Sequence, residues 1–107
     1  MSLSDFSLEG KKALVVGARR NMGKAFALGL AEAGADVAVA DSNLESGQLE
    51  KVGKVIESYG RKALIQKTDI SKREEVDDLV NKVLHSFGTI DILMNVAVMY
   101  HHKSLID

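Results

Sequence analysis

The chain has 107 residues, of which 46% are hydrophobic and 27% are charged, and its formal net charge is −1. That length suits one domain, and the balanced charge leaves no basic surplus for holding nucleic acid or an anionic membrane. The sequence contains no cysteine, which excludes disulfides, thiol catalysis and thiolate metal sites. Because no apolar run approaches the roughly 20 residues of a membrane span, and no signal-peptide pattern lies near the start, we expect a cytoplasmic protein.

The first apolar run, residues 12–16, predicts a buried strand, and a segment rich in Ala, Leu and Gly predicts a helix from about Met22. A glycine turn joins the two. Gly17 permits the tight turn, and Gly23 lets the helix press against the sheet. The unpaired N–H groups and the positive dipole end of the helix favour a bound phosphate at such a turn. We expect this helix to end at Gly34.

A second apolar run, residues 37–40, ends at Asp41. An acid about 20 residues beyond a glycine turn can accept hydrogen bonds from a ribose 2′-hydroxyl. The order of strand, glycine turn, helix, strand and acid therefore predicts a dinucleotide site. The alternative is a βαβ turn whose glycines serve packing alone.

The second helix is predicted to begin at a capping box of Ser42 and Glu45 and to stop at Gly60. Gly47 and Gly53 should weaken it, each by up to about 1 kcal/mol relative to Ala. Its inward face is expected to carry Leu49, Val52, Val55, Ile56 and Tyr59.

A third apolar run, residues 63–65, leads to Asp69, and the helix that follows is well marked by its periodicity. Ser71 and Glu74 are predicted to form its capping box, and Gly88 to cap its end. Its apolar stripe consists of Val76, Leu79, Val80, Val83, Leu84 and Phe87.

A fourth apolar run lies within residues 90–98, so the elements alternate as β-α-β-α-β-α-β. Near-continuous apolar strands joined by helices predict a parallel sheet covered on both faces. We expect an α/β fold, a Rossmann-like doubly wound sheet with strand order 3-2-1-4, in one domain over residues 1–107 with tails at 1–7 and 99–107.

In such a sheet, ligands bind at the carboxyl ends of the strands, where the strand order reverses between the first and fourth strands. The residues expected at those ends are Gly17 to Gly23, Asp41, Asp69 and Asn95.

Residues 8–98 resemble the short-chain dehydrogenase/reductase family. The family opens with Thr-Gly-x-x-x-Gly-x-Gly, and the segment from Val16 matches it at Gly17 and Gly23. Asn21 replaces the middle glycine; Asn tolerates positive φ, although its side chain could crowd the pyrophosphate. The resemblance implies cofactor-binding roles for Gly17, Arg19, Arg20, Asn21, Met22 and Gly23.

The resemblance extends to the third and fourth strands. The family aspartate that contacts adenine corresponds to Asp69, which we count as cofactor-binding together with Ile70. Alternatively, Asp69 is a helix-entry acid near Ser71. The family's Asn-Asn-Ala-Gly corresponds to residues 95–98, in which Asn95 and Ala97 match while Val96 and Val98 do not.

Through this resemblance we expect an NAD(P)-dependent oxidoreductase, of which this chain is the dinucleotide-binding part, acting on a small carbonyl or alcohol substrate. Family members are more than twice as long, and their catalytic serine and Tyr-x-x-x-Lys lie in the second half. Tyr100 and Lys103 are too close together to match, so the chain alone should be inactive. His101 and His102 favour a solvated loop over a metal site. The alternative is a non-catalytic nucleotide-binding or interaction module.

The choice between cofactors depends on opposite charges. Asp41 favours NAD because its carboxylate would repel the 2′-phosphate of NADP. Arg19 and Arg20 favour that phosphate, unless they belong to a solvated turn. We expect the carboxylate to dominate and NAD to be preferred.

The fourth strand would be a sheet edge, with two helices on one face of the sheet and one on the other. This edge is apolar apart from Asp91. Because unpaired apolar edges pair with other chains, we expect self-association through it.

Overall fold

Four parallel strands pair in the order β3-β2-β1-β4 in the computed structural model, which describes residues 7–19, 21–42 and 47–96. The strands are β1 (Lys12–Val16), β2 (Asp36–Asp41), β3 (Ala63–Lys67) and β4 (Ile92–Asn95). They alternate with α1 (Asn21–Glu32), α2 (Gln48–Ser58) and α3 (Arg73–Phe87). The predicted fold class, element order and strand order are confirmed.

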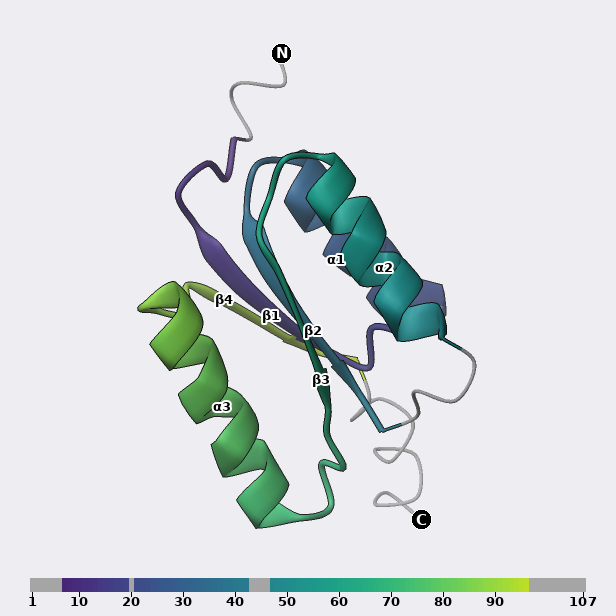
Figure 1. Ribbon diagram of the computed structural model, residues 1–107, viewed down its shortest axis with the longest axis vertical. Coiled ribbons are helices and arrows are strands. Elements are labelled where there is room, and N and C mark those ends of the chain that lie inside the picture. Colours follow the sequence, from purple (N-terminus) through teal and green to yellow (C-terminus); the bar gives the residue numbers. More distant parts are fainter. Residues whose placement is uncertain (1–6, 20, 43–46, 97–107) are drawn as a thin grey trace.

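Two helices cover one face of the sheet and one covers the other, as expected. Figure 1 shows α1 and α2 side by side on one face, with α3 alone on the opposite face. Right-handed crossovers produce this arrangement, because the chain winds from β1 toward β3 and then returns across the sheet to place β4 beside β1. The strand order therefore reverses between β1 and β4, as predicted.

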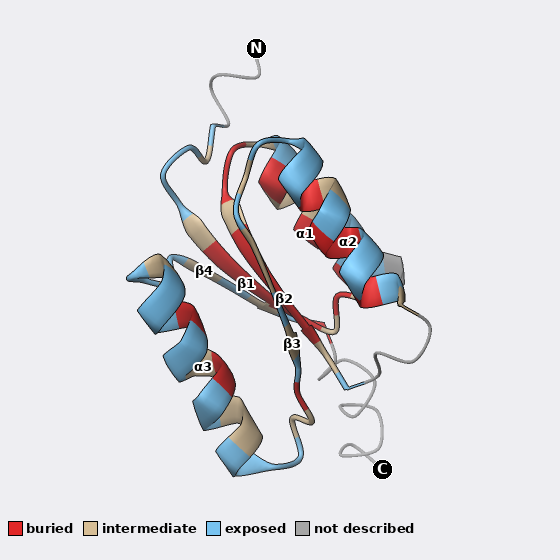
Figure 2. Ribbon diagram, in the orientation of Figure 1, coloured by how far each residue is buried: buried red, intermediate tan, exposed pale blue. Residues whose placement is uncertain are grey.

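The two central strands are buried on both faces, which explains their continuous apolar runs (Figure 2). Val15 and Val39 point into the core beneath α1 and α2, whereas Leu14 and Ala38 pack toward α3. The outer strands β3 and β4 contain alternating partly exposed positions instead.

The start of α2 differs from the prediction. The helix begins at Gln48, and Gly47 occupies the N-cap position with a φ of 69°. The proposed capping box at Ser42 is wrong, because a cap must lie immediately before the helix and Ser42 instead follows the end of β2. Glu45, its expected partner, lies outside the described residues.

The start of α3 also differs. Its N-cap is Lys72, so the predicted box of Ser71 and Glu74 is wrong. Asp69 takes over part of this role: its Oδ1 accepts hydrogen bonds from the Ser71 N–H at 3.0 Å and the Ser71 hydroxyl at 2.6 Å. Glu75, rather than Glu74, reaches back and accepts a hydrogen bond from the Asp69 N–H at 2.9 Å.

The helix ends follow the glycines, as predicted. Gly34, Gly60 and Gly88 all have positive φ, and the Gly88 N–H donates to the Leu84 carbonyl. Two inward assignments are wrong, because Tyr59 and Leu84 are both 41% exposed. Tyr59 follows the last residue of α2, and Leu84 lies on the flank of α3, a helix without a neighbour on its face in the described structure.

Gly53 has a packing role that its helix propensity does not indicate. A Cβ atom at Gly53 would lie 2.4 Å from the Cδ1 atom of Ile65 in β3. The missing side chain therefore lets α2 approach the edge of the sheet.

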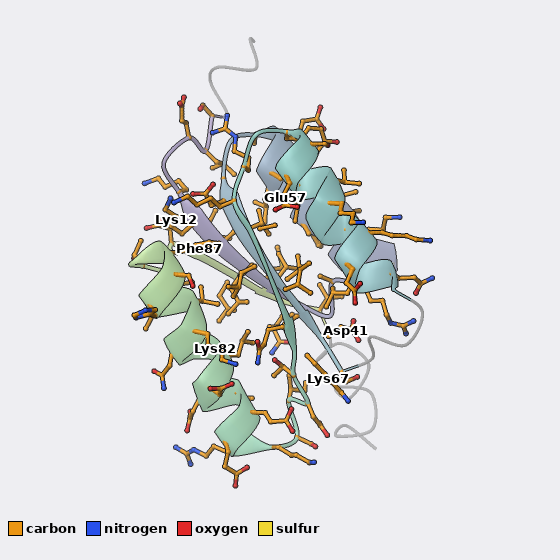
Figure 3. All side chains as sticks on the ribbon, in the orientation of Figure 1. Lys12, Asp41, Glu57, Lys67, Lys82 and Phe87 are labelled. Carbon is orange, nitrogen blue, oxygen red and sulfur yellow. The ribbon has the colours of Figure 1, made fainter. Side chains whose placement is uncertain are left out.

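Charged groups tie the amino ends of the strands together. Lys12 forms an ion pair with Asp36, and its Nζ lies 5.9 Å from the centre of the Phe87 ring (Figure 3). Partial burial by itself would raise the pKa of Asp36, but hydrogen bonds from Lys12 and from the Lys62 N–H outweigh it. The pKa of Asp36 is consequently below its ordinary value.

Candidate functional site

A pocket of about 110 Å³ lies at the carboxyl ends of β1, β2 and β3, opposite the charged cluster. Its volume is well below the roughly 300–1,000 Å³ of sites that enclose a whole drug-sized ligand, so it suits one part of a larger molecule. It is lined by Val16, Gly17, Asp41, Ser42, Thr68, Asp69 and Ile70. Four of the residues singled out in the sequence, Gly17, Asp41, Asp69 and Ile70, are therefore brought together.

The glycine turn is held against the end of β2. Gly17 has a φ of 85°, and its N–H donates to the Ala40 carbonyl at 2.8 Å. A Cβ atom on Gly23 would lie 1.9 Å from the Gly17 carbonyl oxygen. The first turn of α1 thus packs on the backbone of the glycine turn. The sequence analysis expected Gly23 to pack against the sheet instead.

Asp41 is the last residue of β2 (Figure 3). Its side chain is mostly covered. Its Oδ2 accepts a hydrogen bond from the Arg19 N–H at 3.2 Å, and its Oδ1 lies 3.7 Å from the Arg19 Nε. The Arg19 guanidinium also donates through Nη1 to Gln48 Oε1 at 2.9 Å. The acid and one of the two arginines that were weighed against each other are therefore ion-paired.

Asp69 has the helix-entry role considered for it, and it also lies in the pocket lining, where its contact with a cofactor stays a prediction. Its contacts with Ser71 and Glu75 organise the entry to α3, and it also lines the pocket beside Ile70. A structural role in the turn does not prevent it from meeting a ligand, because a carboxylate has two oxygens and several acceptor positions.

Thr68 is a pocket residue to which the sequence analysis gave no role. It is 1% exposed, and its N–H extends the pairing of β2 and β3 by donating to the Asp41 carbonyl at 2.9 Å. Its hydroxyl has no hydrogen-bond partner within the part of the chain that the structure describes. The sequence signal that could have identified Thr68 is its position after a predicted strand. The same signal would have identified Ser42, which also lines the pocket.

Asn95 occupies the carboxyl end of β4, with its Cα paired to that of Val16, and it is exposed. It lies on the strand next to the pocket but does not line the cavity itself. The adjoining Val96 is buried, and its N–H donates to the Val16 carbonyl at 2.9 Å.

The remaining expected residues are less fully placed. Met22 lies in the first turn of α1 and is 50% exposed, while Asn21 begins that helix without a described side chain. Arg20, Ala97, Val98, Tyr100, His101, His102 and Lys103 lie outside the described residues.

The arrangement fits part of a nucleotide. A turn and helix N-terminus can donate N–H groups to phosphate, and a carboxylate at a strand end can accept from hydroxyls. Buried polar atoms normally find partners, and two that have none in residues 7–19, 21–42 and 47–96 belong here: the Thr68 hydroxyl in the pocket lining and the Arg19 Nε beside Asp41. No three described His, Asp or Glu side chains are grouped to hold a metal, and no described helix has the length and apolarity to cross a membrane.

Comparison with known proteins gives one consistent family. The family model for short chain dehydrogenase matches residues 11–107. A short chain dehydrogenase/reductase of Aspergillus oryzae is 41% identical over 99 residues, covering 92% of this chain and 38% of that protein. The 15-hydroxyprostaglandin dehydrogenase [NAD(+)] of Bos taurus is 38% identical over 97 residues, covering 91% and 36%.

The solved structures agree. The crystal structure of NAD+-bound xylitol dehydrogenase is 39% identical with a TM-score of 0.74, covering 79% of this chain and 32% of that one. The chain therefore spans less than two fifths of each of these proteins, and the matched part is the one that carries the glycine turn and the pocket.

Proposed function

Since the chain belongs to the short-chain dehydrogenase family, we propose that it forms the dinucleotide-binding part of an NAD(P)-dependent oxidoreductase. The observation that carries this proposal is the convergence of Gly17, Asp41 and Asp69 on one pocket at the carboxyl ends of three parallel strands. Those residues come from three separate strand ends, so packing within one turn does not explain their meeting. The chain is proposed to form one domain over residues 1–107.

We assign the cofactor's parts by chemistry. The glycine turn and the start of α1 would hold the pyrophosphate, and Asp41 the adenosine ribose. The resemblance to the family implies that Asp69, with Ile70, would contact the adenine. The proposed cofactor-binding residues are Gly17, Arg19, Arg20, Asn21, Met22, Gly23, Asp41, Asp69, Ile70, Asn95 and Ala97.

NAD is the proposed cofactor, in preference to NADP. Asp41 is mostly covered and lies at the pocket, where a carboxylate would repel a 2′-phosphate. Two of the proteins compared above are named with this cofactor, the 15-hydroxyprostaglandin dehydrogenase [NAD(+)] and the NAD+-bound xylitol dehydrogenase.

The proposed reaction is hydride transfer between the nicotinamide ring and a small carbonyl or alcohol substrate, the hydride chemistry being that of the bound dinucleotide. The 107 residues contain no Tyr-x-x-x-Lys, so we expect the chain by itself to bind cofactor without turnover. We also propose a cytoplasmic location.

Self-association is proposed through β4, one of the two edge strands of the described sheet. Leu93 in this strand is 65% exposed, and an apolar strand at a sheet edge can pair with a second copy of the chain.

The test is a calorimetric titration of the purified chain with NADH and NADPH. Saturable binding with NADH tighter is expected, and the Gly23→Ala variant should bind neither well. Binding of neither by the wild-type chain would refute the proposal and favour a non-catalytic interaction module. Tighter binding of NADPH would overturn the assignment of NAD while leaving the dinucleotide site intact.

A turnover assay with carbonyl and alcohol substrates completes this test. Cofactor binding without turnover is the expected result, and measurable turnover would show that the chain is catalytically sufficient.

A further inference from the structure

Arg19 links three elements around the pocket. Its backbone lies in the turn after β1, its N–H and guanidinium meet Asp41 at the end of β2, and its Nη1 reaches Gln48 in the first turn of α2. The three residues form what we call the Arg19 clamp: Arg19, Asp41 and Gln48. A long cationic side chain is thereby fixed beside the acid that should read the ribose.

The ion pair in the clamp is largely shielded from water. The exposed fractions of the two side chains are 16% for Arg19 and 15% for Asp41. Such a pair interacts more strongly than one at the surface, because less water screens the charges. The Arg19 Nε–H is nevertheless buried and makes no hydrogen bond in the described part of the chain, since Asp41 Oδ1 is 3.7 Å away. A buried donor of this kind needs an acceptor oxygen nearby.

We propose that Arg19 is a second specificity-determining residue, whose guanidinium is kept from binding a 2′-phosphate of the cofactor by its ion pair with Asp41. This inference rests on the proposed dinucleotide site. Asp41 then acts twice: its own charge repels a 2′-phosphate, and its ion pair with the guanidinium competes with the binding of that phosphate. In return, the hydrogen bond from the Arg19 N–H holds the carboxylate of Asp41 in place.

The physical argument is the geometry of the guanidinium group. Arginine binds phosphate through two parallel N–H groups, and such charge-assisted hydrogen bonds are about twice as strong as neutral ones. Neutralising Asp41 while keeping its shape would leave a partly buried guanidinium next to the ribose edge. Repulsion by Asp41 alone predicts a different result, in which the identity of residue 19 does not matter.

A double-mutant cycle separates these two explanations. The chain is prepared as wild type, Asp41→Asn, Arg19→Met and the double variant, and each is titrated with NADH and NADPH. Asp41→Asn should move the affinity ratio toward NADPH, and this shift should be at least about tenfold larger with Arg19 present than in the Arg19→Met background. Equal shifts in the two backgrounds would overturn the inference.

The exposed ion pair of Asp78 and Lys82 on α3 is the matched control. Its charged atoms are 3.2 Å apart, and Asp78→Asn and Lys82→Met make the same charge changes on the other face of the sheet. These two variants should leave the affinity ratio unchanged. If they reproduce the shift, a general charge effect explains it and the inference is wrong.

Far-ultraviolet circular dichroism shows whether Arg19→Met still folds. A second variant tests the clamp without removing a charged group. Gln48→Leu removes the anchor of Nη1 without altering either charge, so it should also raise the NADPH affinity relative to that for NADH. An unchanged ratio in this variant would contradict the clamp. Failure of the proposed function is distinguishable, because then the wild-type chain would bind neither nucleotide.

Discussion

The first turn of α1 rests directly on the backbone that precedes it: a Cβ atom on Gly23 would lie 1.9 Å from the carbonyl oxygen of Gly17. The same hypothetical atom would lie 2.8 Å from the Gly17 carbonyl carbon. Because backbone atoms cannot rotate away as a side chain can, the contact fixes the separation of helix and turn. It therefore sets the space in which a phosphate group could meet the helix N-terminus.

Gly23→Ala should destabilise the fold by about 1–3 kcal/mol, the usual cost of forcing an extra group into a packed site, and should abolish nucleotide binding. Urea unfolding and calorimetric titration measure the two effects. Gly29→Ala is the control in the same helix, since a Cβ there meets nothing within 4 Å. That control should gain about 0.5–1 kcal/mol from helix propensity. Normal binding by the Gly23 variant would refute the role of this contact.

Gly53→Ala should gain helix propensity yet lose packing, because the new Cβ would lie 2.4 Å from the Cδ1 atom of Ile65. In an Ile65→Ala background that obstacle is absent, so the same substitution should be more favourable there by about 1 kcal/mol. Unfolding free energies of the four variants give this coupling. Additive effects would show that α2 adjusts its distance from β3 without cost.

Asp36 should make stability depend on pH in the acid range. Its pKa in the folded chain is lowered, so its contribution is present above its unfolded pKa of about 3.9 and disappears as the pH falls through the lower folded value. Asp36→Asn should therefore be less stable at pH 7, and its stability should fall less steeply than that of the wild type below about pH 4.

Urea unfolding measured from pH 7 to pH 2 checks this, with Asp77→Asn on the exposed surface of α3 as a control for loss of one carboxylate. The control should keep the pH dependence of the wild type. If the free energy of unfolding of Asp36→Asn and of the wild type changes with pH in parallel, Asp36 does not cause the pH dependence.

Leu93→Lys should reduce association of the purified chain. A lysine on an edge strand opposes pairing with a second edge, and Leu93 is exposed enough to accept it without loss of core packing. Sedimentation velocity across a concentration series would measure the change. Leu84→Lys on α3 introduces the same charge at another exposed apolar position and should leave the association unaltered. A wild-type chain that is monomeric throughout would contradict the proposal.

The sequence by itself determined the order of the elements and the sheet. Continuous apolar runs such as that of β1 are stable when buried on both faces, and Gly60 and Gly88 stop helices because positive φ suits glycine. The carboxyl ends of the strands in a parallel sheet lie along the same edge of the sheet. Asp41 and Asp69 could therefore be expected near the glycine turn from the sequence alone.

Tertiary structure decided the partners of those residues. In the sequence, Asp41 favoured NAD and Arg19 favoured NADP. Their ion pair depends on the turn after β1 lying beside the end of β2. Likewise, Glu75 rather than Glu74 bonds to Asp69, because side-chain direction and not spacing alone selects the partner. The spacing of apolar residues determines which helices and strands form. Hydrogen bonds and ion pairs need their atoms within a few ångströms of each other, and only the packed tertiary structure sets those distances.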